Sequence, residues 1–218
     1  MYYYLFDSVA SDKKYESLMN RIDFRLIELG LNGRMDKLTI LKNMRELIEA
    51  AIKRGAETVV IAGDDESVTK AVSILAPYNV TLGIIPIGSN RRIARALGIP
   101  EGEAACDILS KRVVKSIDLG KVNDQYFLFS LDIPAQNVTV ECDGHYQISV
   151  LGLPRPFSIC NFQPESRSTS SNPEDGILEA VIDDEQSRGM FRKLRSGGAT
   201  VLPLKRAKIQ CATASIPL

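Results

Sequence analysis

Histidine is scarce in this chain, and its cysteines are not paired in the sequence. The 218 residues include one histidine, His145, and four cysteines that lie far apart, at positions 106, 142, 160 and 211. Structural zinc sites need closely spaced cysteine and histidine ligands, and no such spacing occurs. We therefore expect no zinc centre. Buried thiols are the expected state of the cysteines, and His145 beside Asp143-Gly144 is expected in a surface turn rather than as a catalytic base.

Long apolar runs and net charge are also lacking. No segment approaches the run of about 18 apolar residues that a membrane-spanning helix needs. The apolar start over residues 1–6 has no cationic region, so we expect it to be a first strand rather than a signal peptide. The chain has 27 lysine and arginine residues and 27 aspartate and glutamate residues. It therefore has no net positive charge that would favour nucleic acid as a partner. We expect a cytoplasmic protein, and the composition leaves open both peripheral membrane contact and a homodimer.

The first strand-to-helix turn lies at residues 63–67. Val59–Ala62 is a short, β-branched apolar run that ends at Gly63, which predicts a strand buried on both faces. An apolar stripe at helical spacing then follows, ending at Leu75. The acids and the serine between strand and helix are therefore expected at the helix N-terminus, where such side chains act as caps.

The second strand-to-helix turn repeats this pattern at residues 86–90. A buried strand over 80–85 is followed by Pro-Ile-Gly-Ser-Asn, in which Gly88 permits close backbone approach and Ser89 is expected to cap the next helix. Since the carboxyl ends of parallel strands meet at one edge of a sheet, the two turns should face the same edge. Their backbone N–H groups, with three nearby arginines, are suited to phosphate oxygens.

The pattern changes at about residue 123. The earlier part predicts strands over 2–7, 34–40 and 112–119 besides those above, with helices over 15–29, 41–52 and 101–111. The later part shows alternating segments separated by Asp-Gly and Pro, which is typical of an antiparallel sheet with hairpins. It predicts strands over 126–131, 136–142, 145–151, 156–162, 176–182 and 206–212, a polar loop over 163–172 and a short basic helix over 186–194. We expect that helix's charged face to be solvated rather than bound to lipid.

Four motifs resemble the diacylglycerol kinase catalytic domain family, whose superfamily includes sphingoid-base kinases and NAD kinases. The family's Gly-Gly-Asp-Gly-Thr falls on residues 63–67. Its Pro-x-Gly-Thr-x-Asn-Asp-Phe-Ala-Arg-x-Leu-Gly-Ile-Pro falls on 86–100, with agreement at both prolines, both glycines and Ala94-Arg95. Segments 117–123 and 173–182 are similar to its Asp-x-Gly-x-x-Asn and Asp-Gly-Leu-Leu elements.

The resemblance implies a fold and an activity. The fold is an open, mostly parallel α/β sheet with helices on both faces over 1–122, followed by an antiparallel β-sandwich-type domain over 123–218. The activity is that of an ATP-dependent lipid kinase that phosphorylates the hydroxyl of diacylglycerol or a related lipid with Mg²⁺ as cofactor. The β domain would shape the cleft for the acyl chains.

The resemblance also implies roles for particular residues. Asp65 would organise metal and phosphate, and Asp175 would belong to the magnesium loop. The nucleotide would be held by Thr39, Gly63, Asp64, Glu66, Ser67, Gly88, Ser89 and Asn90. Residue chemistry leaves other readings open: Asp65 as a helix cap, Asp175 as part of an Asp-Gly turn, and Asp118 as a solvated strand end rather than part of a polar network.

The departures from the family pattern define a second hypothesis. Asp64 and Glu66 replace motif glycines, and carboxylates there add repulsion toward a phosphate; Arg91-Arg92 replaces the family's Asn-Asp. The family's Asp-Gly-Glu, whose glutamate is the general base, would fall beyond Leu218, so we expect the chain to be incomplete at its C-terminus. The alternative is a catalytically impaired nucleotide- or ligand-binding protein, or a scaffold, on the same fold.

Overall fold

The computed structural model describes residues 1–7, 12–39, 42–133, 138–149, 157–161, 172–182 and 200–211. The chain divides into two compact units. The first comprises Met1–Ser116 with Lys121–Phe127, and the second comprises Ile117–Gly120 with Leu128–Leu218. Among the described residues, no helix is both long enough and apolar enough to cross a membrane.

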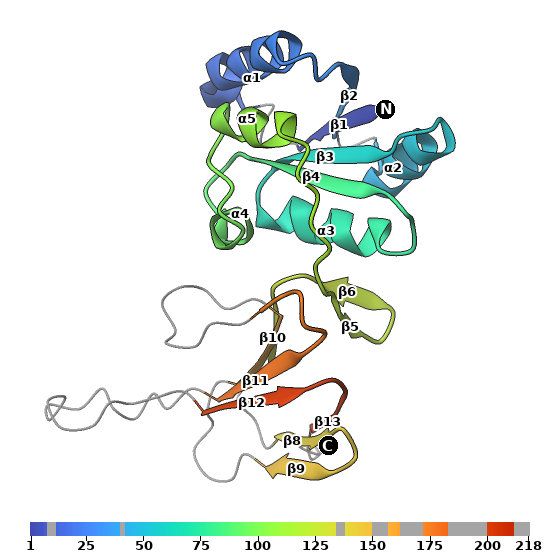
Figure 1. Cartoon of the computed structure of the whole chain (residues 1–218), viewed down its shortest axis with the longest axis vertical. Helices are drawn as coiled ribbons and strands as arrows, with labels where there is room; N and C mark the ends of the chain where they lie inside the picture. Colours follow the sequence, from blue (N-terminus) through green and yellow to red (C-terminus); the bar gives the residue numbers. More distant parts are fainter. Residues whose placement is uncertain are drawn as a thin grey trace, which may run out of the picture. The chain divides into compact units, whose positions relative to one another are not determined.

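The first unit is built on a parallel sheet. Its strands are β1 (Tyr2–Phe6), β2 (Gly33–Lys37), β3 (Thr58–Gly63) and β4 (Thr81–Pro86), in the order β2-β1-β3-β4. The other elements are η2 (Lys13–Tyr15), α1 (Glu16–Glu28), α2 (Met44–Lys53), α3 (Asp65–Leu75), α4 (Arg92–Ala96) and α5 (Ala104–Ser110), with the short pair β5 (Gly120–Val122) and β6 (Gln125–Phe127). In Figure 1, α1 and α5 lie on one face of the sheet and α3 on the other.

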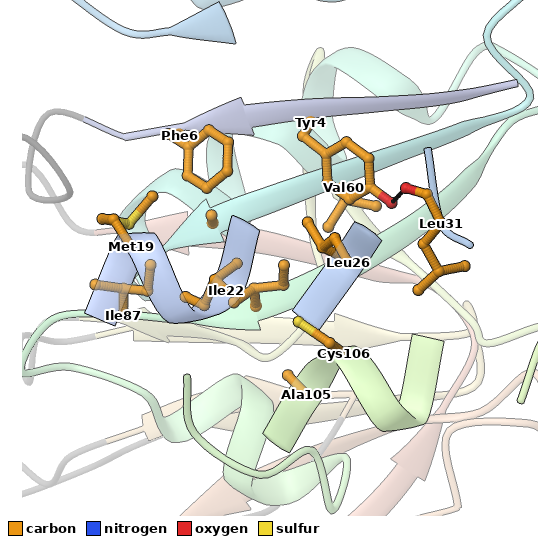
Figure 2. Packing of buried hydrophobic residues seen from close by; sticks show 12 residues of the cluster. Tyr4, Phe6, Met19, Ile22, Leu26, Leu31, Val60, Ile87, Ala105 and Cys106 are labelled. Carbon is orange, nitrogen blue, oxygen red and sulfur yellow. Dashed lines mark hydrogen bonds between the residues drawn. The ribbon is translucent and has the colours of Figure 1, made fainter. Parts of the chain in front are cut away.

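Alternation along the strands builds a core on each face of this sheet. Tyr4 and Phe6 of β1 share a face with Val60 and Ala62 of β3, and the buried side of α1 packs on them through Met19, Ile22 and Leu26, as Figure 2 shows. The Tyr4 hydroxyl is buried there and donates to the carbonyl of Leu31 at 2.7 Å. Because β3 and β4 are rich in buried β-branched residues, these strands are fixed firmly enough to position the turns at their ends.

The second unit is antiparallel. Its strands are β7 (Ser130–Ile133), β8 (Val138–Cys142), β9 (Tyr146–Ser149), β10 (Phe157–Cys160), β11 (Leu178–Ile182), β12 (Thr200–Leu204) and β13 (Ala207–Cys211). They form two sheets, ordered β12-β11-β10-β7 and β13-β8-β9. The predicted fold class, an open parallel α/β sheet followed by antiparallel sheets, is confirmed.

Two predictions about strands are wrong: the strand predicted over 126–131 is divided between β6 and β7, and the strand predicted over 112–119 is absent. Residues 112–119 include three β-branched residues but form no strand, and Val113 and Val114 are 76% and 66% exposed. No described strand pairs with them, and the ladder begins only at Gly120. The strand β12 was not predicted, because Pro203 within it lacks an N–H. It is tolerated since β12 lies at the edge of its sheet. The predicted basic helix over 186–194 and most of the loop over 163–172 lie outside the described residues.

Candidate functional site

The candidate site lies where β1, β3 and β4 end. The chain leaves β1 through α1 toward β2 on one side, and it continues from β3 through α3 to β4 on the other side. The carboxyl ends of β1 and β3 are therefore a topological switch point, where open α/β sheets form their ligand crevice. Asp7 directly follows β1, and its N–H donates to the carbonyl of Ala62 in β3 at 2.9 Å.

The first turn is capped by its own residue. Asp64 is the N-cap of α3, and its carboxylate oxygen accepts from the amides of Glu66 at 3.1 Å and Ser67 at 3.3 Å. This confirms the predicted capping for Asp64 alone, because its carboxylate satisfies amides that have no partner within the helix. The same amides are those that a helix N-terminus would offer to a phosphate.

Ser67 is also engaged within the chain. Its side chain is buried, and its hydroxyl donates a short hydrogen bond to the Asp7 carboxylate. Gly63 is packed beneath this pair: a Cβ on Gly63 would lie 2.9 Å from that of Asp7 and 3.1 Å from that of Ser67. Glycine is required at this position because the Asp7 and Ser67 side chains approach the backbone so closely.

The second turn has no cap of its own. Gly88 is buried and has φ 101°, a conformation that favours glycine. The prediction that Ser89 caps the following helix is wrong, since the N-cap of α4 is Arg91, which makes no side-chain capping bond. Instead the carboxylate of Asp65 reaches across and accepts from the amides of Arg92 at 2.8 Å and Ile93 at 3.0 Å. The first turn thus supplies the cap that the second turn lacks.

Backbone hydrogen bonds also join the two turns. The Asp65 N–H donates to the carbonyl of Asn90 at 2.9 Å, and the Ile87 N–H donates to the carbonyl of Gly63 at 2.9 Å. Together with the Asp65 carboxylate, these bonds make residues 63–67 and 87–93 one unit. The expectation that both turns face one sheet edge is confirmed by these contacts.

Basic side chains form ion pairs with acidic side chains at and near the two turns. Lys70 binds Glu66 at 2.6 Å on the exposed face of α3. This hydrogen bond raises the pKa of Lys70, and the charges of Asp7 and Asp64 act in the same direction. On the second turn, Arg91 pairs with Glu101 at 2.7 Å, while its Nε–H is buried without a partner among the described residues. The edge therefore carries both signs of charge.

The other predicted site residues lie in different places. Ser89 and Asn90 are exposed on the second turn, and Thr39 is exposed just after β2. In the second unit, the Asp175 side chain accepts from the Ile177 N–H at 2.9 Å, which is an Asp-Gly turn of the ordinary kind. Asp118 accepts from the Gly176 N–H at 2.7 Å, so it belongs to the polar network of that loop.

Among the described residues, neither a cluster of metal ligands nor a surface hollow marks these two turns as a binding site. Within the described ranges, no three side chains of His, Cys, Asp or Glu are grouped so that they could hold a metal ion on their own. Two surface hollows of about 550 and 300 Å³ flank α1 and contain none of the predicted site residues. A magnesium ion here would need further ligands, such as phosphate oxygens and water, as Mg²⁺ commonly has.

Asp7 was missed as a site residue. Its signal in the sequence is the same as that of Asp64: an acid that directly follows a buried apolar strand. The sequence pattern places Asp7 at the end of the strand predicted over 2–7 and assigns it no further role. Its contact with Ser67 depends on the pairing of β1 with β3, which a local pattern does not give.

The proteins that this sequence is similar to are described as kinases. The family model described as the diacylglycerol kinase catalytic domain matches residues 2–122. A diacylglycerol kinase of Bacillus subtilis is 42% identical over 84 residues, which are 37% of this chain and 27% of that enzyme. A putative lipid kinase of Streptococcus pneumoniae is 27% identical over 183 residues, which are 78% of this chain and 62% of that protein. The similarity therefore spans less than two thirds of either relative.

The fold has a counterpart among solved structures. A crystal structure of a diacylglycerol kinase from Bacillus anthracis superposes with a TM-score of 0.76 at 17% identity, covering 97% of this chain and 86% of that one. At this identity the likeness concerns the fold alone. The family model covers more than half of the chain, including both turns. The chain belongs to the diacylglycerol kinase catalytic domain family.

Proposed function

We propose that this chain carries the nucleotide-binding part of an ATP-dependent lipid kinase. The reaction transfers the terminal phosphoryl group of ATP to a hydroxyl of diacylglycerol or a related lipid and releases ADP. The observation that carries the proposal is the joining of the two strand-to-helix turns through Asp65 at the switch point of the sheet. Phosphoryl transfer depends mainly on positioning and charge neutralisation, and such a fixed edge supplies positioning.

The placement of the residues supports the role that we propose for each. Gly63 and Gly88 are buried and set the shape of the turns, while Ser89 and Asn90 are exposed, so their side chains are accessible to a phosphate. Thr39, after the neighbouring strand, would contact the nucleoside. Asp65 holds the second turn against the first. Arg92 and Lys70 add positive charge at this edge, which favours an anionic ligand.

Mg²⁺ fits the proposal as a partner of the nucleotide. Asp64 and Glu66 are carboxylates beside the turn, and oxygen ligands of this kind suit Mg²⁺ when phosphate oxygens and water complete its shell. The bound ion would neutralise phosphate charge. Asp175, in the second unit, is proposed as a separate ligand in its own loop.

A second function is favoured by how the turns are occupied. Asp64 accepts from two amides of α3, Asp65 from two amides of α4, and Asp7 from the Ser67 hydroxyl. The chain's own carboxylates thus take the donors that a phosphate would use. This favours a catalytically impaired member of the family that acts by binding a ligand or partner rather than by phosphoryl transfer.

One assay separates the two functions. The full-length protein is incubated with labelled ATP, Mg²⁺ and, in separate reactions, diacylglycerol, a sphingoid base and NAD. We expect label in the lipid product, and we expect it to disappear in Asp65→Asn. The matched control is Asp107→Asn, which removes a carboxylate of α5 that pairs with Arg25 of α1 and belongs to neither turn.

Two outcomes of the assay would contradict these expectations. Absence of transfer to every acceptor, with no thermal shift by ATP or ADP, would remove the kinase proposal and leave the binding function. Equal loss of transfer in Asp107→Asn would mean that stability rather than the joined turns is responsible. Far-ultraviolet circular dichroism on each variant shows that the fold is retained.

A further inference from the structure

The segment that follows α5 exposes two adjacent valines. Val113 and Val114 are 76% and 66% exposed, the largest values among the large apolar side chains that the structure describes. Both belong to the run that was predicted as a strand and that pairs with no described strand. Because valine is among the residues most often buried, an adjacent pair at this exposure suggests a surface that another molecule covers.

The residue before the valines is fixed to the first unit. Helix α5 ends at Ser110, and Arg112 has φ 53°, the left-handed conformation in which many helices terminate. The Arg112 N–H donates to the carbonyl of Leu109 at 3.2 Å, and its guanidinium carbon lies 5.9 Å from the centre of the Tyr2 ring. These contacts determine where the chain leaves α5, so the exposure of the valines belongs to an anchored turn.

The charges beside the valines all have one sign. Lys111 and Arg112 precede them and Lys115 follows, and all three residues are exposed. No acidic residue occurs from position 108 to 117. The last acid before the segment, Asp107, pairs with Arg25 of α1 at 2.6 Å. The valines therefore lie within a locally cationic surface, although the chain as a whole has no net charge.

A second exposed apolar pair lacks this environment. Phe24 and Ile27 of α1 are 64% and 65% exposed, nearly as much as Val114. Their neighbours along the helix include the acids Asp23 and Glu28. An anionic surface would be repelled there and attracted at residues 111–115. The two pairs therefore separate the effect of apolar exposure from that of local charge.

We propose that residues 111–115, called here the Val-Val segment, bind the surface of an anionic membrane. Val113 and Val114 enter the interface between headgroups and acyl chains, and the three cations lie against the lipid phosphates and anionic headgroups. A specific protein interface needs about 800 Å² from each partner, far more than five residues supply. A few apolar side chains with neighbouring cations are sufficient for reversible binding to a bilayer. The proposal rests on exposed side chains of the first unit and is independent of the proposed kinase activity.

The first test measures the contribution of the valines. The full-length protein is mixed with vesicles of phosphatidylcholine alone or of equimolar phosphatidylcholine and phosphatidylglycerol, without nucleotide or acceptor, and the bound fraction is measured by co-sedimentation. We expect binding to the mixed vesicles that weakens as salt is added, and little binding to phosphatidylcholine. The double variant Val113→Ser/Val114→Ser should bind the mixed vesicles roughly tenfold more weakly. Phe24→Ser is the matched control and should bind like wild type.

The second test measures the contribution of charge. Lys111→Gln should weaken binding to the mixed vesicles by roughly fivefold. Lys42→Gln removes the same charge from an exposed residue after β2 and should have no such effect. Circular dichroism checks that each variant is folded, and if the double valine variant is not, the comparison of Lys111→Gln with Lys42→Gln decides.

Three results would overturn the proposal. The first is a wild-type protein that binds the mixed vesicles no better than phosphatidylcholine, as expected if the segment meets an acidic protein surface instead. The second is a folded double valine variant that binds as tightly as wild type. The third is a loss of binding in Phe24→Ser or Lys42→Gln equal to that of its matched variant.

Discussion

The two strand-to-helix turns have similar sequence patterns and different means of support. The first carries its own cap, Asp64, on the eleven-residue helix α3. The second begins the five-residue helix α4 without a side-chain cap of its own, and it takes the carboxylate of Asp65 from the first turn. This difference indicates that the second turn depends on the Asp65 carboxylate of the first turn for its stability. Four changes test this comparison.

Asp65→Ala should have the largest effect. It removes the charged acceptor of two amides, those of Arg92 and Ile93, and hydrogen bonds to charged groups contribute about 1.5–3 kcal/mol each to stability. Because α4 is short and water can replace part of the loss, we expect a decrease of about 2 kcal/mol in the free energy of unfolding by urea. A decrease no larger than that of Asp107→Ala would show that the second turn does not depend on the first.

Asp64→Ala should cost less than Asp65→Ala. Loss of an N-cap aspartate typically costs about 1 kcal/mol, and replacement by glycine only a few tenths. We therefore expect Asp64→Gly to be nearly as stable as wild type in the same urea titration. If Asp64→Ala proved more destabilising than Asp65→Ala, the proposed asymmetry between the turns would be reversed.

Ser67→Ala isolates the bond between α3 and β1. The Ser67 hydroxyl is buried and donates to Asp7, so its loss should lower the free energy of unfolding by about 1 kcal/mol, the net value of an ordinary hydrogen bond. A double-mutant cycle with Asp7→Ala measures the coupling directly. A coupling energy near zero would mean that the two side chains are neighbours without mutual stabilisation.

Ser89→Ala should have the smallest effect. Ser89 is exposed and does not cap α4, so the change in stability should stay within about 0.5 kcal/mol, as for most surface substitutions. Nucleotide binding is the quantity that would respond, because Ser89 is proposed to contact phosphate. A loss of stability as large as that of Asp65→Ala would contradict the capping assignment.

The sequence predicted the parts of this site that depend on local pattern. The apolar run over 59–62 ending at Gly63, followed by acids and a helical stripe, gave the first turn and its cap correctly. It did not predict the contact of Asp65 with Arg92 or that of Asp7 with Ser67. Both contacts depend on how β1, β3 and β4 pair in the sheet, which a local pattern does not determine. The same reason accounts for the failed strand over 112–119: β-branched residues favour a strand, but a strand also needs a neighbour to pair with.

The most direct test of the account is the equilibrium binding of ADP in the presence of Mg²⁺, measured by isothermal titration calorimetry on wild type, Asp65→Ala and Asp107→Ala. The account predicts saturable binding by wild type, retained in Asp107→Ala and weakened by roughly tenfold or more in folded Asp65→Ala, because the second turn is no longer held against the first. Equal affinities in all three proteins, or no binding by wild type, would contradict it.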